Sequence, residues 1–228
     1  MHVQLLTHTP DPERIVAGAA RLCYSDSSID DLIGREQAEQ EQLLRKILEL
    51  GHLSVLEHAS FTFGVEGISR ACSHQLVRHR LASYSQQSQR YVSFDDTFDA
   101  VTPPSIAGKP ELAGKYAALI EQLHQSYVEL VEAGVPAEDA RFVLPNAAAT
   151  KIVITMNGRE LKHFFHLRCC RRAQWEIQIM ARQMLKLARQ TAPLLFASAG
   201  PGCLEGPCPE GAMTCGAVKE VRQEFSDL

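Results

Sequence analysis

Several hallmarks of other protein classes are missing from this sequence of 228 residues. The first residues contain no basic segment followed by an apolar one, so we expect no secretory signal. No apolar run approaches the roughly 20 residues that a membrane helix needs, so we expect no membrane partner. A Gly-x-Gly-x-x-Gly motif between a strand and a helix is also absent, which argues against a Rossmann-type dinucleotide site. These absences favour a cytoplasmic protein, without internal repeats, that belongs to none of these classes.

An excess of positive charge is lacking as well. The formal net charge is −4 and there is a single tryptophan, whereas nucleic-acid grooves combine broad positive charge with stacking aromatic rings. We therefore expect no nucleic-acid partner. Two local cationic clusters stand out against this background, Arg78–Arg80 with Arg90, and Arg168 with Arg171 and Arg172. They favour small anionic ligands, and the alternative is that they are solvated helix faces.

The chain contains seven cysteines, an odd number that suits reduced thiols in the cytoplasm. Cys203, Cys208 and Cys215 lie in the C-terminal part, where a zinc ion or a cluster could use them with a fourth ligand from elsewhere. The spacing contains no Cys-x-x-Cys pair, so we expect no metal and leave the role of these thiols open. His52, Glu57 and His58 match no zinc-enzyme motif either.

The pattern of apolar and polar residues predicts an α+β protein. Strands are expected over residues 3–7, 61–65, 90–94 and 151–156, and helices from about residue 12 and over 35–50, 69–80, 110–133 and 158–192. Residues 83–89 are predicted to be a polar loop, and the Gly-, Pro- and Cys-rich residues beyond Ala199 an irregular tail. The strands are too few and too unevenly spaced for a doubly wound sheet. We predict a mixed sheet with long helices in a single domain, residues 1–195, followed by a tail, residues 196–228.

The densest group of polar side chains lies between Arg78 and Tyr91. Three basic residues are followed, after two others, by seven residues of which six carry a hydroxyl or an amide and one, Tyr84, a phenol. Guanidinium groups bind phosphate with two parallel hydrogen bonds, and hydroxyls and loop amides can satisfy the remaining oxygens. The segment therefore suits a phosphate or the edge of a nucleotide base. A solvated polar turn is the alternative that composition alone leaves open.

This segment resembles a known signature. Arg-His-Arg, seven residues and then serine (Arg78, His79, Arg80 and Ser88) is similar to the motif of flavin-dependent thymidylate synthases, and Gln89-Arg90-Tyr91 resembles its continuation. Other landmarks of that family occur in the same order, over about residues 1–195: Gly51-His52, Glu57-His58, Phe61–Phe63, Gln75, Ala140–Pro145, Asn157–Arg159, Leu167-Arg168 and Gln174–Ile177.

The resemblance implies a methyltransferase that converts dUMP to dTMP. Methylenetetrahydrofolate supplies the one-carbon unit in this family, and FAD reduced by NADPH supplies the hydride. The resemblance also implies a homotetramer with active sites shared between subunits. The reductant preference, the affinities and the order of methylene and hydride transfer stay open.

The family's functional residues carry over position by position. Arg168 matches the catalytic arginine, held against the pyrimidine edge. The dUMP contacts correspond to Gln75, Arg78, Gln86, Gln87, Ser88, Gln89, Arg90, Arg141 and Arg168. The flavin contacts correspond to Ser54, Arg78, His79, Arg80, Gln86, Asn157, Arg159 and His163, with His52 and Tyr91 beside the flavin and folate pocket. Gln86 and His163 stand where some members carry Glu and Asn.

Two rival hypotheses accompany this interpretation. Cys169 and Cys170 follow Arg168 directly, and nearby arginines lower a thiol pKa, so a cysteine could instead attack uracil. The second rival, from a different class, is a module that binds nucleic-acid phosphates through the two arginine clusters. A yellow protein that NADPH bleaches would favour the flavoenzyme, whereas a colourless protein that shifts DNA would favour the rival.

Overall fold

The computed structural model of the protein describes residues 1–94 and 99–228. Contacts divide these residues into two compact units. Unit 1 comprises residues 1–2, 65–78 and 84–153, and unit 2 comprises residues 3–64, 79–83 and 154–228.

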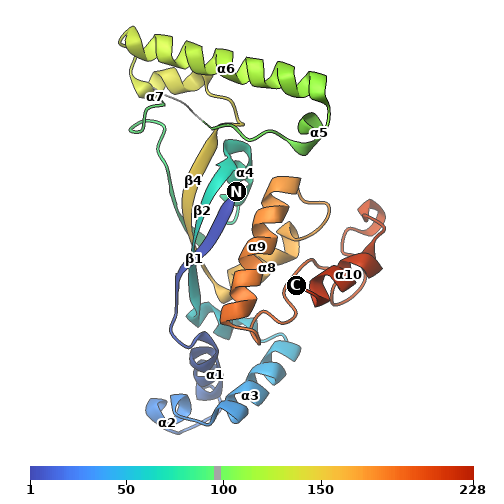
Figure 1. The fold of residues 1–228 in the computed structure, drawn as a ribbon. Coiled ribbons are helices and arrows are strands. Elements are labelled where there is room, and N and C mark those ends of the chain that lie inside the picture. Colours follow the sequence, from blue (N-terminus) through green and yellow to red (C-terminus); the bar gives the residue numbers. More distant parts are fainter. Residues whose placement is uncertain (95–98) are drawn as a thin grey trace. The chain divides into compact units, whose positions relative to one another are not determined.

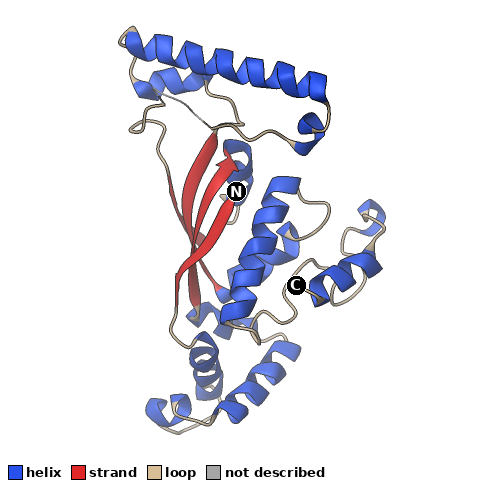
Figure 2. Ribbon diagram, in the orientation of Figure 1, coloured by secondary structure: helices blue, strands red, loops and turns tan. Residues whose placement is uncertain are grey.

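One four-stranded sheet supplies strands to both units (Figure 2). Its order is β1 (His2–His8), β2 (Ser60–Ser69), β4 (Ala149–Asn157) and β3 (Ala82–Gln86). The pairing is antiparallel, whereas the sequence predicted a mixed sheet. Helices and strands alternate irregularly along the chain, which confirms the α+β prediction.

Unit 2 carries two groups of helices. The first contains α1 (Pro12–Leu22), α2 (Ile29–Ile33) and α3 (Gln37–Glu49), with the 3₁₀ helix η1 (Leu53–His58) packed on α1. The second contains α8 (Gly158–Arg168) and α9 (Trp175–Thr191), which pack side by side (Figure 1). A cluster of aromatic rings forms part of the core, because Phe196 lies edge-on to Phe61 and Phe165 at centroid distances of 5.2 and 6.0 Å.

Unit 1 contains α4 (Arg70–Leu76), α5 (Pro104–Ala107), α6 (Pro110–Glu132), α7 (Ala137–Ala140) and the 3₁₀ helix η2 (Arg141–Val143). The side chain of Ser69 caps α4 by accepting a hydrogen bond from the backbone N–H of Cys72. Helix α6 is the longest, with 23 residues, and Tyr127 is its one buried residue among those described. It packs against α5, α7 and η2.

Several predicted elements are confirmed. Strands β1, β2 and β4 and helices α1, α3 and α6 coincide with predicted ones to within a few residues. A glycine follows the end of both α3 and α6, where Gly51 and Gly134 have φ angles of 72° and 86°, a left-handed conformation that glycine adopts without a steric penalty. Among the described residues, none of the helices has the length and apolar character needed to cross a membrane.

The region around the Arg-His-Arg motif differs from the prediction. Helix α4 ends at Leu76 instead of reaching Arg80, so the arginines lie beyond its last turn. The predicted loop over 83–89 is partly strand β3, because its polar side chains alternate along an exposed edge of the sheet. The strand predicted over 90–94 is absent from these residues, which form a turn in which the Val92 N–H donates to the Ser88 carbonyl.

The long helix predicted over residues 158–192 is two helices. It breaks after Arg168, and Gln174 starts α9 by accepting hydrogen bonds from the backbone N–H groups of Glu176 and Ile177. Neither proline nor glycine marks this break, so composition did not reveal it. Arg168 consequently lies at the C-terminal end of α8 and not in the middle of a long helix.

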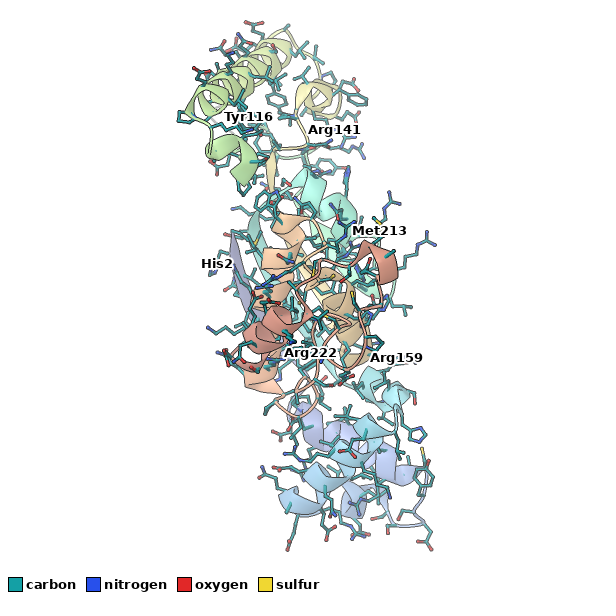
Figure 3. The ribbon with its side chains drawn as sticks, turned by 90° about the vertical axis from the view of Figure 1, so that its right-hand side faces the viewer. His2, Tyr116, Arg141, Arg159, Met213 and Arg222 are labelled. Carbon is teal, nitrogen blue, oxygen red and sulfur yellow. The ribbon has the colours of Figure 1, made fainter. Side chains whose placement is uncertain are left out.

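The C-terminal tail, predicted to be irregular, is partly helical. It contains η3 (Gly211–Met213) and α10 (Val218–Ser226), whose Val221 and Phe225 are buried. Arg222, labelled in Figure 3, donates hydrogen bonds to the carbonyls of Cys203 and Gly206 at 2.9 and 2.7 Å. The amphipathic spacing of Val221 and Phe225, four residues apart, was the signal for this helix.

Candidate functional site

The best-defined polar cluster of unit 2 is a chain of three side chains that includes the motif's histidine. His79 is 4% exposed, and its Nδ1 lies 3.1 Å from Oε1 of Glu160, which is 6% exposed. On the other side of the ring, Nε of Arg168 donates to Nε2 of His79 at 3.0 Å. The three side chains therefore form a relay, Glu160–His79–Arg168, in which Glu160 and His79 are buried and Arg168 is half-buried.

The hydrogen bonds determine which nitrogen of His79 carries the proton. A guanidinium can only donate, so Nε2 must accept with its lone pair. Nδ1 therefore carries the proton and donates it to the Glu160 carboxylate. Burial lowers the pKa of His79 below its ordinary value, the Glu160 hydrogen bond acts in the opposite direction, and the charge of Arg168 lowers the pKa again. The imidazole is neutral near pH 7.

Helix α8 presents the relay on one face. Glu160, Phe164 and Arg168 follow each other at four-residue intervals, which places them along the same stripe of the helix. The rings of His79 and Phe164 meet edge to face, with a centroid distance of 5.0 Å, and His163 lies 5.9 Å from His79. The apolar ring of Phe164 shields the middle of the relay from water.

A rim of polar groups is formed where α8 begins and packs against η1. The Gly158 N–H donates to the Ala59 carbonyl at 2.8 Å, and a Cβ at Gly158 would lie only 3.0 Å from the Leu56 carbonyl oxygen. Glycine thus permits the close approach of the two elements. Asn157 caps α8 by accepting from the Glu160 N–H at 2.9 Å. Next to it, exposed Arg159, labelled in Figure 3, pairs with Glu57 of η1 at 2.6 Å.

The other unit 2 candidates are exposed. His52 and Ser54 belong to the η1 region, His163 lies on α8, and Arg80 follows the buried His79. Unit 2 therefore places Ser54, Asn157 and Arg159 where η1 packs against the start of α8, and it groups His79 with His163 and Arg168 farther along that helix.

In unit 1, strand β3 orders the polar segment. The Gln86 side-chain amide donates to the hydroxyls of Ser73 and Thr150 at 3.0 and 3.2 Å. The Gln87 N–H donates to the Lys151 carbonyl at 2.9 Å, which extends the ladder by one residue. Beyond this point the Ser88 hydroxyl accepts from the Arg90 N–H at 3.1 Å and closes the turn.

Arg90 and Arg141 meet at one residue, Glu138 of α7. Arg90 donates to the Glu138 carboxylate through Nε at 2.9 Å and Nη2 at 2.8 Å, while Nε of Arg141 donates to the Glu138 carbonyl at 2.9 Å. Burial lowers the pKa of Arg70, and the charge of Arg141 lowers it further. Three arginines outnumber the two acidic residues of α7, Glu138 and Asp139, so this region has a positive excess that suits an anion.

The remaining unit 1 candidates lie in α4, in η2 or in the segment that follows α4. Arg78 and Tyr91 are exposed, Tyr91 to 82%, and Gln75 and Gln89 are half-buried. Figure 3 labels Arg141, which begins η2. Unit 1 therefore contains all of the predicted dUMP contacts except Arg168.

The structure opposes the cysteine rival at one of its two positions. Cys169 is fully buried, and burial raises the pKa of its thiol to about 12, so the thiolate that would act as nucleophile is strongly disfavoured. Cys170 is half-buried. In the described parts of the chain, no group of three histidines, cysteines or acidic residues is arranged to hold a metal ion.

Sequence reasoning missed the acidic partners and the hydroxyl partners of these sites. Glu160 and Glu138 were not singled out, and neither were Ser73 and Thr150. A signal existed for Glu160, since it lies eight residues before Arg168 on an expected helix and so on the same side of it. Glu138 gave no comparable signal, because its approach to Arg90 joins residues 48 positions apart.

Comparisons with known proteins agree on one family. Residues 4–194 match the family model described as thymidylate synthase complementing protein. The chain is 59% identical, over all of its length and 99% of the relative's, to the flavin-dependent thymidylate synthase of Geobacter sulfurreducens. It is 44% identical to the flavin-dependent thymidylate synthase of Clostridium tetani, over 98% of this chain and 96% of the relative. It is 45% identical to that of Thermococcus onnurineus, over 99% of this chain and 96% of the relative. The chain therefore belongs to the thymidylate synthase complementing protein family.

Proposed function

We propose that this protein is a flavin-dependent thymidylate synthase that methylates dUMP to dTMP in thymidylate biosynthesis. Methylenetetrahydrofolate is the one-carbon donor and NADPH the source of reducing equivalents. The observation that carries the proposal is the 59% identity to a relative of that name over the whole chain. The Arg-His-Arg motif and Ser88, recognised in the sequence independently, support it.

The polar rim of unit 2 fits FAD by its chemistry. Phosphate oxygens are bound by arginine and by a helix N-terminus, and the flavin ring system offers carbonyl and nitrogen acceptors to hydroxyl and amide donors. Arg159, Asn157 and Ser54 meet this description at the junction of α8 and η1, and Arg80 and His163 add exposed donors. Bound FAD would supply the hydride after its reduction by NADPH. The folate partner would bind beside His52 of unit 2.

The unit 1 cluster suits dUMP. Arg78, Arg90 and Arg141 offer guanidinium forks for the phosphate, and the turn from Gln86 to Gln89 offers backbone N–H groups and side-chain amides. Gln75 adds an amide to the same set. Arg90 is bound to Glu138 in this structure, so we propose that the phosphate takes the place of that carboxylate. An exposed ion pair contributes little free energy, which makes such an exchange inexpensive.

Arg168 is the residue we propose to activate the pyrimidine. Carbon 5 of uracil is a weak nucleophile. A guanidinium held at the pyrimidine edge stabilises negative charge that spreads from N3 into the ring, and so raises the reactivity of carbon 5. The position at the end of α8, anchored to His79, supports this role because a charge stabiliser must be held in place before the reaction.

We further propose that the protein acts in the cytoplasm as a homotetramer with shared active sites. Helix α6 supports this assembly, because a surface helix normally buries a stripe of its face, whereas α6 buries Tyr127 and leaves Leu112 and Leu119 about half exposed. Leu112 and Leu119 would each be removed from water by contact with a second copy of the chain, which is favourable for apolar side chains. Sedimentation of the purified protein tests the stoichiometry.

The test of the activity is an anaerobic assay for dTMP. Purified protein is incubated with dUMP, methylenetetrahydrofolate, FAD and NADPH, and then with each of them omitted in turn. We expect product only in the complete mixture, and bleaching of the yellow chromophore when NADPH is added. Product in the absence of flavin would overturn the proposal. A colourless protein that shifts DNA in moderate salt would favour the nucleic-acid module instead.

A further inference from the structure

We propose that Glu160 and His79 are positioning residues that hold the guanidinium of Arg168 in its working orientation. The inference rests on the proposed function for the role of Arg168. It assigns to His79 a task different from the flavin contact that the family resemblance implies. It also brings into the site a glutamate that the motif does not contain.

His79 is held by protein partners at both of its ring nitrogens. Both ring nitrogens are engaged inside unit 2, at 3.1 Å to Glu160 and 3.0 Å to Arg168, and the residue is 4% exposed. The ring nitrogens thus point toward protein partners on both sides, and Phe164 packs against the ring at a centroid distance of 5.0 Å. A ligand could reach this ring only by displacing one of these partners. His79 therefore acts most directly on Arg168.

The position of Arg168 explains why an anchor is needed. It is the last residue of α8, after which the chain turns through residues 169–174 into α9. Helix ends fray, and arginine has several rotatable bonds, so the backbone alone does not orient the guanidinium. A hydrogen bond at Nε, the nitrogen nearest the aliphatic stem, restricts the rotation of the whole planar group. Catalytic groups require placement to within about 0.5 Å, which such a bond can provide.

The charges explain why histidine is suited to the middle position. Glu160 stabilises the Nδ1–H form, which presents a lone pair at Nε2 to the positive guanidinium. A protonated imidazole would instead turn a donor toward Arg168 and repel it. Burial and the charge of Arg168 keep the ring neutral. His163, a further ionisable group beside the ring, also lies on α8 and lowers the pKa of His79, as Arg168 does.

The first test is a direct reading of the tautomer and needs no turnover. We would record imidazole ¹⁵N NMR spectra of the flavin-loaded protein and assign His79 with a His79→Gln variant. The expected result is a neutral ring with the proton on Nδ1 at about pH 7. In Glu160→Ala the Nδ1–H signal should shift or be lost. A neutral ring protonated on Nε2 in the wild type would overturn the relay.

The second test separates positioning from folding by steady-state kinetics. Glu160→Ala should lower kcat about 10- to 100-fold, the range expected from losing one hydrogen bond to a charged group, with the KM for dUMP changed less than about twofold. Glu160→Gln keeps an oxygen that accepts from Nδ1, so it should recover most of the loss. Glu176→Gln is the matched control, because Glu176 is 2% exposed on α9, and we expect wild-type kcat.

A double-mutant cycle completes the design. Lysine lacks the Nε–H group of the guanidinium, so Glu160→Ala should have little further effect in an Arg168→Lys background. Multiplicative losses, or a Glu160→Ala enzyme with wild-type kcat, would overturn the inference. A wild-type protein that forms no dTMP would overturn the proposed function instead, while the NMR result would still decide whether the relay exists.

Discussion

Replacing Cys169 by alanine distinguishes two ways of activating uracil. If a thiolate attacked the ring, the thiol next to Arg168 would be indispensable. If Arg168 stabilises charge in the ring, the neighbouring thiol is only a small buried side chain. The environment of Cys169 favours the second mechanism, and the pKa of its thiol shows how strongly the thiolate is disfavoured.

Cys169 is fully buried, and burial raises the pKa of its thiol to about 12, although the charges of Arg182 and Arg189 act to lower it. At about pH 7 such a thiol is ionised in roughly one molecule in 100,000. The fraction of the thiol present as the nucleophilic thiolate is therefore roughly a thousandfold lower than for an ordinary cysteine. A mechanism through Cys169 would first have to overcome that deficit.

We therefore expect Cys169→Ala to form dTMP with a kcat within about threefold of wild type, since a typical buried substitution costs about 1 kcal/mol of stability and leaves the protein folded. Cys170→Ala should behave in the same way. Arg168→Ala should lose about 100-fold or more in kcat, the size found when a transition-state donor is removed.

The assay is the anaerobic conversion of dUMP to dTMP by flavin-loaded proteins, with thermal unfolding as a control for structure. Mass spectrometry after brief treatment with iodoacetamide should show Cys169 unlabelled in the native protein. The reasoning is refuted if a folded, yellow Cys169→Ala protein is inactive while Arg168→Ala keeps its turnover.

Three further predictions concern stability and pH. Phe225 in α10 is 3% exposed and the Arg182 guanidinium lies 4.9 Å from its ring centroid, so Phe225→Ala should lower the free energy of unfolding by about 3–5 kcal/mol and Tm by roughly 10 °C. The control Met213→Ala changes a residue that is 60% exposed and should leave Tm unchanged. Equal Tm values for the two variants would show that the tail does not contribute to stability. Gly158→Ala places a Cβ 3.0 Å from the Leu56 carbonyl oxygen, so it should lower the free energy of unfolding by about 1–3 kcal/mol and weaken FAD binding. The control Gly114→Ala adds a Cβ in open space and should raise the free energy of unfolding, measured by chemical denaturation, by about 0.4–1 kcal/mol. A Gly158→Ala protein as stable as wild type would contradict the tight contact. Burial and the charge of Arg168 lower the pKa of His79 in the folded protein, so the unfolded chain binds a proton more readily. The free energy of unfolding should therefore fall as the pH drops from about 6.5 toward the folded pKa, and His79→Gln should show a shallower pH dependence. Parallel curves for the two proteins would argue against a neutral buried ring.

Much of the fold could be predicted because its signals are local. A run of β-branched residues marked β4, an apolar stripe marked α3, and glycine marked the left-handed ends at Gly51 and Gly134. The errors arose where distant partners decide the structure. Strand β3 has a loop-like composition and becomes a strand by pairing with β4. The break after Arg168 depends on a side-chain cap, which no single residue type announces.

The candidate site shows the same division. The motif from Arg78 to Ser88 and the position of Arg168 identified the family from one-dimensional spacing, and the comparisons confirmed that family. Spacing could not reveal that His79 is buried between Glu160 and Arg168, because residues 79 and 160 are 81 positions apart. Roles that depend on a neighbour across the fold became visible only in three dimensions.

The junction of Asn157 and Gly158 has a consequence for how the protein ages. In flexible chains an asparagine followed by glycine deamidates readily, because the glycine backbone nitrogen attacks the side-chain carbonyl carbon and expels ammonia to form a cyclic imide. Here the Gly158 nitrogen donates to the Ala59 carbonyl at 2.8 Å, and the Asn157 side-chain oxygen accepts from the Glu160 N–H at 2.9 Å. Both reacting groups are held by other partners, so the folded protein protects this dipeptide, and deamidation there becomes a record of how often the start of α8 has opened.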